Sequence, residues 1–292
     1  MAIFVDRETR LVVQGLTGSE GRFHGLRNRA YGTNLVAGVT PGKGGQDVEG
    51  VPVLDTVAEA VAEHGANTAM VFVPAPFAAD AIYEAIDARV HTVITITEGV
   101  PAHEMLRIHG YARARGVRTL GPNCPGALSP GKANVGIIPA EIFTEGSIGL
   151  VSRSGTLTYQ IGHELTQMGL GNSTIVGIGG DPVVGSSFVD VLGLFQEDPE
   201  TEYVVMVGEI GGDEEEKAAE CIRSEMTKPV VAYIAGFTAP PGKTMGHAGA
   251  IISGSSGTAE AKKKALEEKG VRVGKSPTET AQLAAEAVGA KA

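Results

Sequence analysis

One histidine and one glutamate, far apart in the sequence, have the residue types and surroundings that nucleophilic catalysis needs. His247 lies between Gly246 and Ala248, in a loop of small residues that leaves both edges of the imidazole ring accessible. An imidazole is a nucleophile near neutral pH when a carboxylate holds its other nitrogen. Glu209 follows an apolar run, so we expect it at the carboxyl end of a strand, where ligands bind in open α/β sheets. We predict that Glu209 orients His247; the alternative is a surface acid at a loop mouth.

A second candidate is the start of a helix that follows another apolar run. Ser154 and Thr156 flank Gly155, and each hydroxyl can cap the helix or donate to an anion. The free N–H groups of a helix N-terminus favour a negative charge, so this helix could receive a phosphoryl group placed on His247. A plain helix cap remains the alternative. Ser154 is a poor nucleophile here, because no nearby histidine is evident as its base.

Near the N-terminus, the spacing of glycines predicts a loop that binds phosphate. Gly15, Gly18 and Gly21 recur at every third position between an apolar run and a helical pattern. An NAD site should show an acidic residue after the second strand, about 20 residues on. The sequence has instead a glycine-rich turn that carries Lys43, which suits a further phosphate. This favours NADP or a phosphorylated adenosine such as coenzyme A (CoA) over NAD.

The two cysteines and the charge runs carry weaker signals. Cys124 lies between proline and glycine turns, where it could approach a thiol ligand or serve only as packing, and Cys221 is expected in a helix core. No closely spaced cysteines and histidines predict a metal site. The acidic run 213–216 is typical of a first helical turn, and the lysine run 262–264 is expected to be a solvated face.

Two series of alternating strands and helices must position these residues. The apolar runs expected as strands are 11–16, 34–40, 68–75, 92–98, 118–120, 148–151, 173–178, 203–210 and 230–235. Amphipathic stretches expected as helices are 19–30, 56–64, 77–89, 102–115, 156–168, 186–196, 214–226, 258–269 and 277–288. Strands that are apolar throughout are buried on both faces, so the pattern predicts parallel, doubly wound sheets. The alternation breaks over 121–147, which is rich in turn formers and predicts a crossing between two domains near 121–130.

Composition excludes several classes of protein. The chain has 24 basic and 34 acidic residues, and a net charge of −10 gives no footprint for nucleic acid or an anionic membrane. No apolar run reaches the ~18 residues of a membrane span, and the first residues lack the layout of a signal peptide. Two cysteines in 292 residues exclude a disulfide framework, so we expect a cytoplasmic protein. The 41 glycines exceed the usual share and predict tight turns and close backbone approaches to a ligand.

Taken together, the motifs resemble the alpha subunit of succinyl-CoA synthetase (succinate–CoA ligase). The resemblance covers nearly the whole chain in order, through segments 17–19, 39–45, 73–76, 96–99, 121–126, 152–159, 177–182, 208–212 and 246–250. It implies an α/β protein with an N-terminal Rossmann-like CoA-binding domain over 1–125. A flavodoxin-like, doubly wound ligase domain would follow over 126–292.

The resemblance also implies a reaction and its residues. Succinate, CoA and ATP or GTP would give succinyl-CoA, NDP and phosphate through a phosphohistidine on His247, with Glu209 as its orienting acid. Ser154, Gly155 and Thr156 would hold the phosphate, and Tyr159 would belong to the substrate pocket. The positions implied for CoA are Thr17, Gly18, Ser19, Glu20, Lys43, Ile96, Thr97 and Glu98, with Cys124 nearby. At position 20 a glutamine is common in the family, and a carboxylate there would repel the CoA phosphates.

No Walker-type phosphate loop is present, and the family places the nucleotide and its Mg²⁺ on a beta subunit. The resemblance therefore implies an αβ or α₂β₂ assembly, without which the chain would not perform the full reaction. Three other functions stay open. An NADP-dependent oxidoreductase explains the first loop and Lys43 but leaves His247 without a role. A non-enzymatic CoA-sensing pair of domains would transfer no phosphate, and a related acyl–CoA or malate–CoA ligase would differ only in its acid.

Overall fold

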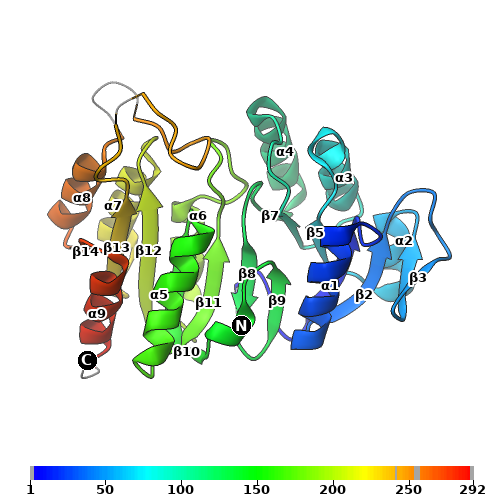
Figure 1. Ribbon diagram of the computed structural model, residues 1–292, viewed down its shortest axis with the longest axis horizontal. Helices are drawn as coiled ribbons and strands as arrows, with labels where there is room; N and C mark the ends of the chain where they lie inside the picture. Colours follow the sequence, from blue (N-terminus) through cyan, green and yellow to red (C-terminus); the bar gives the residue numbers. More distant parts are fainter. Residues whose placement is uncertain (1–2, 241, 253–256, 290–292) are drawn as a thin grey trace.

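Two seven-stranded sheets, formed by consecutive halves of the chain, lie side by side in the computed structural model (Figure 1). The structure describes residues 3–240, 242–252 and 257–289. No helix in these ranges is long and apolar enough to cross a membrane. β7 ends at Leu120 and β8 begins at Gly126, so the link between the sheets is short. The domain division at 125/126 stays a prediction.

The first sheet has the strand order β3-β4-β2-β1-β5-β6-β7. Its strands are β1 (Arg10–Gln14), β2 (Asn34–Val39), β3 (Asp47–Val48), β4 (Val51–Leu54), β5 (Thr68–Val71), β6 (Thr92–Thr95) and β7 (Arg118–Leu120). All neighbours pair in parallel except β3 with β4. Counted in sequence, the six parallel strands stand in the order 3-2-1-4-5-6, which is the Rossmann order. The order in which strands are added to the sheet reverses between β1 and β5, and ligands bind at such a switch point.

The second sheet has the order β14-β13-β12-β10-β11-β8-β9. Its strands are β8 (Gly126–Ser129), β9 (Ala133–Gly136), β10 (Glu145–Ser152), β11 (Asn172–Gly177), β12 (Tyr203–Glu209), β13 (Val230–Ala235) and β14 (Arg272–Gly274). The five strands from β10 to β14 are parallel and stand in the flavodoxin-like order 2-1-3-4-5. The β8–β9 hairpin adds to β11 in antiparallel orientation. The predicted fold class is confirmed.

Helices cover both sheets, and their bounds follow the apolar pattern closely. They are α1 (Ser19–Tyr31), α2 (Val57–His64), α3 (Ala75–Asp87), α4 (Ala102–Arg115), α5 (Gly155–Gln167), α6 (Phe188–Glu197), α7 (Glu214–Glu225), α8 (Ala259–Glu268) and α9 (Pro277–Val288), with a short 3₁₀ turn η1 (Ala140–Ile142). α5 packs against α9, and α7 packs against both α6 and α8. These helices bury the apolar strands on both faces, as the uninterrupted apolar runs require.

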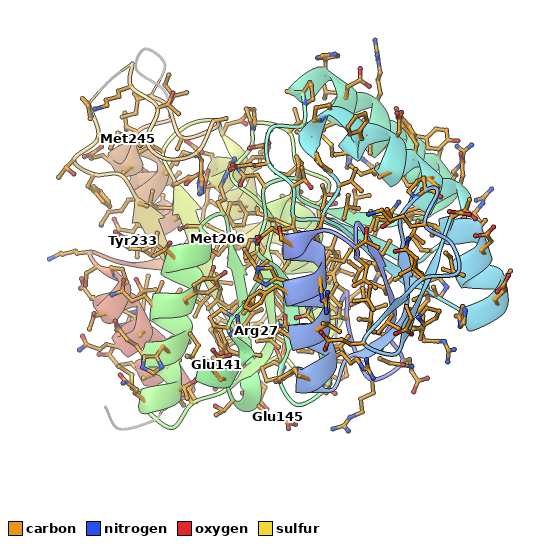
Figure 2. The ribbon with its side chains drawn as sticks, turned by 45° about the vertical axis from the view of Figure 1, so that its right-hand side comes forward. Arg27, Glu141, Glu145, Met206, Tyr233 and Met245 are labelled. Atoms are coloured by element: carbon orange, nitrogen blue, oxygen red, sulfur yellow. The ribbon has the colours of Figure 1, made fainter. Side chains whose placement is uncertain are left out.

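The two halves share one packed boundary. A single buried apolar cluster contains residues of both sheets, from Leu11 of β1 to Phe195 of α6. Asn28 of α1 donates from Nδ2 to the carbonyl of Gly136 at 3.1 Å. Figure 2 shows Arg27 of α1 beside Glu141 of η1, and its Nη2 donates to both carboxylate oxygens at 2.7 and 2.8 Å. The halves therefore meet through a core and polar bonds, with α1 beside the β8–β9 hairpin (Figure 1).

Two expectations are wrong. The stretch 121–147 is not only a crossing, because it contains β8 and β9, which belong to the second sheet. The lysine run 262–264 is not a solvated face throughout, because Lys262 is fully buried in an ion pair with Glu215. Short strands such as β3, β4 and β14 were not expected either, since two to four residues are too few to show a period.

Candidate active site

The ends of β10 and β12 bring together a histidine, a carboxylate and an arginine. Nδ1 of His247 lies 2.8 Å from Oε2 of Glu209, which is the last residue of β12. Nε of Arg153, the residue after β10, lies 3.3 Å from the other oxygen of that carboxylate. Glu209 and Arg153 are both buried, whereas about a quarter of the His247 side chain is exposed. The predicted pairing of Glu209 with His247 is present in the structure.

The Glu209 carboxylate fixes which nitrogen of His247 is available for chemistry. A carboxylate only accepts hydrogen bonds, so Nδ1 carries the proton and donates it. The lone pair of the neutral ring is then on Nε2, on the opposite edge. The hydrogen bond that Nδ1–H donates to Glu209 raises the pKa of His247, and desolvation and the charge of Arg153 act against that rise. Glu209 thus orients the ring and stabilises the positive charge that develops when Nε2 attacks an electrophile.

Backbone contacts hold the histidine loop over the sheet. Residues 242–252, between β13 and α8, lie along the upper edge of the second sheet in Figure 1. Gly249 N–H donates to the Gly180 carbonyl at 3.1 Å, which ties this loop to the one after β11. A Cβ atom at position 180 would lie 2.2 Å from Cγ of His247, so only glycine leaves room for the ring. The ring is held between Gly180 on one side and the Glu209 carboxylate at Nδ1.

The helix α5 begins directly after β10, the strand that neighbours β12 and its last residue, Glu209. Ser154 is the N-cap, and its hydroxyl accepts a long 3.4 Å hydrogen bond from the amide of Leu157. β10 pairs with both β11 and β12, so this helix begins between the strand that leads to Gly180 and the strand that ends in Glu209. Tyr159 is half-buried one turn along, and burial raises the pKa of its phenol to about 12. The phenol therefore stays protonated and can donate a hydrogen bond to an anion.

A second cluster forms at the carboxyl ends of β1 and β2. Nζ of Lys43 donates to Oγ1 of Thr17 at 3.1 Å, which in turn donates to Oγ1 of Thr40 at the same distance. Gly18 caps α1 without a side-chain hydrogen bond, so the first-turn amides near Ser19 remain for an anion. Glu20 lies in this first turn and is exposed. The two glycine-rich loops singled out in the sequence thus form one site.

An apolar cavity of about 520 Å³ adjoins this cluster at the switch point of the first sheet. It is lined by Gln14, Gly15, Val39, Thr40, Pro41, Val73, Pro74, Phe77, Asp80, Ala81 and Glu84. A site that combines an apolar crevice with a lysine and free helix amides fits an adenine nucleotide with several phosphates.

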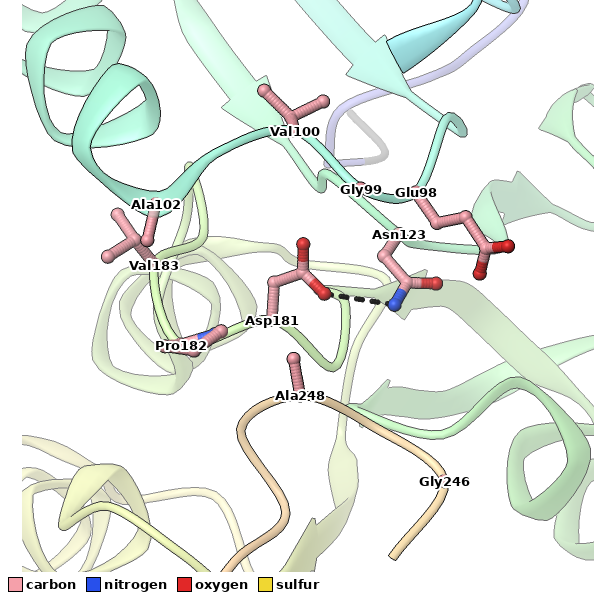
Figure 3. Close-up of a pocket in the computed structure, with 10 residues that line it drawn as sticks. All are labelled: Glu98, Gly99, Val100, Ala102, Asn123, Asp181, Pro182, Val183, Gly246 and Ala248. Carbon is pink, nitrogen blue, oxygen red and sulfur yellow. Dashed lines mark hydrogen bonds between the residues drawn. The ribbon is translucent and has the colours of Figure 1, made fainter. Parts of the chain in front are cut away.

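A second cavity, of about 600 Å³, lies between the two halves (Figure 3). Glu98 and Val100, after β6, line it from the first half. Asp181 and Ala248 line it from the second half, and Ala248 is the neighbour of His247. Nδ2 of Asn123 donates to Asp181 at 2.9 Å across this cavity (Figure 3). The cavity joins the end of β6 to the histidine loop.

Ile96, Thr97 and Cys124 do not line this cavity but are close in sequence to residues that do, Glu98 and Asn123. Oγ1 of Thr97 donates to the carbonyl of Val73 at 2.7 Å, and Ile96 is half-buried at the carboxyl end of β6. Cys124 is buried and its thiol donates to the carbonyl of Thr95 at 3.3 Å. Burial raises the pKa of this thiol to about 12, so it stays protonated and unreactive.

The comparisons with known proteins agree with this geometry. A CoA binding domain model matches residues 6–99, and a CoA-ligase model matches residues 151–272. The succinate–CoA ligase [ADP-forming] subunit alpha 2 of Archaeoglobus fulgidus is 61% identical over 98% of this chain and 99% of its own.

The chain belongs to the succinate–CoA ligase alpha-subunit family. Another alpha subunit of this ligase, from Aquifex aeolicus, is 58% identical and covers 98% of this chain and 94% of its own. An ATP citrate lyase structure from Methanothrix soehngenii superimposes with a TM-score of 0.89 at 23% identity. It covers 98% of this chain and 50% of the lyase chain, which shows a shared fold.

Sequence reasoning missed three charged side chains at or behind the His247–Glu209 pair of this alpha subunit: Arg153, Asp181 and Lys262. Arg153 and Asp181 belong to loops already singled out, but no spacing rule marks an arginine or aspartate beside a distant carboxylate. Lys262 was hidden in a charge run that is typical of a surface. In the part of the chain that the structure describes, no cluster of three or more His, Cys, Asp or Glu side chains could hold a metal ion.

Proposed function

We propose that this chain, with a beta subunit, catalyses the reversible reaction of succinate, CoA and a nucleoside triphosphate to succinyl-CoA, nucleoside diphosphate and phosphate. The observation that carries this proposal is the 2.8 Å contact of His247 with Glu209, beside a cavity that joins the two halves. The ADP-forming names of the relatives favour ATP as the nucleotide.

The steps follow from the free Nε2 of His247. Nε2 attacks the γ-phosphorus of the nucleotide, and the bond to the diphosphate breaks. A succinate carboxylate oxygen then takes the phosphoryl group, which restores the neutral ring and gives succinyl phosphate. The CoA thiolate attacks the acyl carbon of that intermediate, and inorganic phosphate leaves. Glu209 holds Nδ1–H throughout and balances the positive charge of the ring.

The start of α5 meets the charge of the transferred group. The amides of Gly155 and Thr156 and the hydroxyl of Ser154, whose own amide donates to Ser152 Oγ at 3.0 Å, would hold the phosphate, since α5 begins beside the strand that ends in Glu209. The protonated phenol of Tyr159 would donate to the succinate carboxylate. The phosphoryl group would therefore move between fixed donors with little rearrangement of the protein.

CoA would lie along the edge of the first sheet. Its phosphates would contact the amides of Thr17, Ser19 and Glu20 and the ammonium of Lys43. Gly18, whose amide donates to the Gly15 carbonyl, would let the phosphates approach the backbone closely. The backbone at Ile96, Thr97 and Glu98 would lead its thiol into the cavity beside Ala248, with buried Cys124 nearby. Exposed Glu20 would turn its carboxylate to solvent and use only its amide.

The beta subunit would supply the nucleotide site and Mg²⁺, in an αβ or α₂β₂ assembly. Mg²⁺ would neutralise the phosphates of the nucleotide there. The beta subunit would have to approach the loop of His247. Met245 (Figure 2) and Gly246 are exposed in this loop. Two free, buried cysteines fit a reducing compartment such as the cytoplasm.

Labelling of the histidine tests this function. The assembled enzyme, incubated with ATP labelled at its γ-phosphate, should give an acid-labile, base-stable phosphoprotein with the label on His247. H247N should give no label, whereas H163N, which changes a histidine in α5 remote from the Glu209 contact, should label normally. Undiminished labelling of H247N would contradict the proposal.

A further inference from the structure

A fully buried ion pair is hydrogen-bonded to the backbone of the segment that carries Glu209. Glu215 of α7 and Lys262 of α8 both have fully buried side chains and contact each other. Oε1 of Glu215 accepts a hydrogen bond from Glu209 N–H at 3.0 Å. Nζ of Lys262 donates to the carbonyl of Gly211 at 2.7 Å. The pair therefore bonds to the backbone on both sides of Ile210.

The Glu209 amide needs this partner because the neighbouring strand ends before it. Arg153 N–H donates to the Val207 carbonyl, and β10 then turns into α5. Ile210 N–H bonds to Ala235 of β13, so the preceding amide, of Glu209, faces the side that β10 has left. The Glu215 carboxylate takes the place of the missing strand. Position 208 must be glycine for this, since a Cβ there would lie 2.5 Å from Cγ of Glu215.

Lys262 connects the helix after the histidine loop to the segment that follows Glu209. α8, which carries Lys262, follows the loop that contains His247, whereas Gly211 follows the strand that ends in Glu209. Gly211 N–H also donates to the Gly257 carbonyl, just before α8. Lys262 and Glu215 thus link the backbone at Glu209 to the end of the loop that carries His247.

Stability alone does not account for such a pair. Two charges lose their hydration when they are buried, and apolar side chains of similar volume are often equally stable in their place. Burial raises the pKa of Glu215, and the charge of Lys262 opposes that rise. What the charged pair supplies, and an apolar pair would not, is directed hydrogen bonds to two backbone groups next to Glu209.

We propose that Glu215 and Lys262 are positioning residues for phosphoryl transfer, which hold the backbone of Glu209 so that its carboxylate meets Nδ1 of His247. The inference rests on the function proposed above. The charged groups around the ring are Glu209 and, more distantly, Arg153 and Asp181, and neither Glu215 nor Lys262 touches it. The pair acts on the histidine through Glu209.

The test uses double variants that remove both charges of the Glu215–Lys262 pair together; Glu216, whose carboxylate lies 3.8 Å from Lys262 and is partly exposed, is unchanged in all of them. In the assembled enzyme, E215L/K262M should lower the rate of His247 phosphorylation by about 10- to 100-fold, because a small displacement of a catalytic group has effects of that size. E215Q/K262M keeps an oxygen that can accept the Glu209 amide, so it should lose less. K263M is the matched control, since Lys263 pairs with Glu267 on the surface of the same helix.

A thermodynamic cycle and a spectroscopic measurement separate positioning from simple loss of stability. If the pair acts through Glu209, adding E209Q to E215L/K262M should cause almost no further loss of rate. NMR of ring-labelled His247 should show its titration moved to lower pH in E215L/K262M, towards that of E209Q. The proposal would be overturned if the rate losses of E209Q and E215L/K262M multiplied in the combined variant and the His247 titration did not move.

The NMR titration also distinguishes this inference from the proposed function. If unaltered enzyme forms no phosphohistidine, the proposed function fails, but the titration still reports whether the pair sets the contact between Glu209 and His247. If the enzyme is phosphorylated and E215L/K262M, folded by circular dichroism, is phosphorylated at the full rate, only the positioning role fails.

Discussion

At the scale of single residues, the chemistry depends on which nitrogen of one ring is free. Glu209 takes Nδ1–H of His247 at 2.8 Å and leaves Nε2 for attack. Arg153, 3.3 Å from the same carboxylate, offsets part of the resulting rise in the basicity of the ring. The histidine thus gains orientation from Glu209 while Arg153 limits the fraction of the ring that is protonated and unreactive.

Substitution of Glu209 should change both the size and the pH dependence of phosphorylation. E209Q keeps an acceptor for Nδ1–H but no charge, so the rate should fall by about 100-fold, as for loss of a preorganised electrostatic partner. Glu209 raises the pKa of His247, so its loss lowers that pKa and the neutral ring persists to lower pH. The acid limb of the pH–rate profile should therefore move to lower pH. An unmoved limb would contradict the role given to Glu209.

The same contact has a consequence for stability with a definite sign. A histidine whose pKa is raised on folding adds stability that is fully present below the ordinary pKa of about 6.5. That stability is lost as the pH rises through the raised value. Urea unfolding of E209Q should therefore differ most from the unaltered chain at acid pH and least at alkaline pH.

At the scale of elements, the site is made by strand ends and the loops that follow them. β10, β11 and β12 are neighbours in the sheet, so Arg153, Gly180 and Glu209 converge although they are far apart in sequence. The loop after β13 then lays His247 against this edge. Parallel strands thus concentrate on one edge what the sequence disperses.

A single added methyl group should disturb that convergence. In G180A the new Cβ would lie 2.2 Å from Cγ of His247, so the ring must move, and phosphorylation should fall by about 100-fold. G193A is the matched control, because a Cβ there meets nothing within 4 Å. CoA binding, measured by calorimetry, should be retained in both. Normal phosphorylation of G180A would show that His247 can react without its ring packed against position 180.

Prediction from the sequence succeeded where a physical period or a turn signal exists. The apolar runs predicted the long strands, because uninterrupted apolar sequence reflects burial on both faces. The glycine-rich loop that carries Lys43 lies against Thr17 as expected, whereas anion binding there and at Ser154 stays a prediction. The β8–β9 hairpin escaped, since four-residue strands among turn formers show no period. Arg153 and Lys262 escaped for another reason: their partners are set by tertiary contacts across 47 or more residues.

At the scale of the whole molecule, the two sheets behave as one packed body. The buried cluster that runs from β1 to α6 crosses the boundary between them, as do the bonds of Asn28 and Arg27. The cavity beside Ala248 is lined from both halves, so its shape depends on that boundary. A packed boundary of this kind would hold the proposed CoA site and the histidine loop at a fixed separation.

Calorimetry of the chain should therefore show one cooperative unfolding transition. N28A removes a bond from buried Asn28 to the Gly136 carbonyl across the boundary and should cost about 1–3 kcal/mol, shifting the single midpoint downward. N34A, at the exposed start of β2, is the matched control. Two separate transitions in the unaltered chain would show that the sheets unfold independently.

The buried pair of Glu215 and Lys262 also constrains how this sequence can change over generations. Replacing either residue alone leaves an uncompensated charge in the interior, which is strongly destabilising, whereas exchanging both for apolar residues is tolerable for folding. A lineage can therefore leave this arrangement only through an unstable intermediate or by two simultaneous changes. The residues at positions 215 and 262 should therefore change together or not at all, although 46 residues separate them.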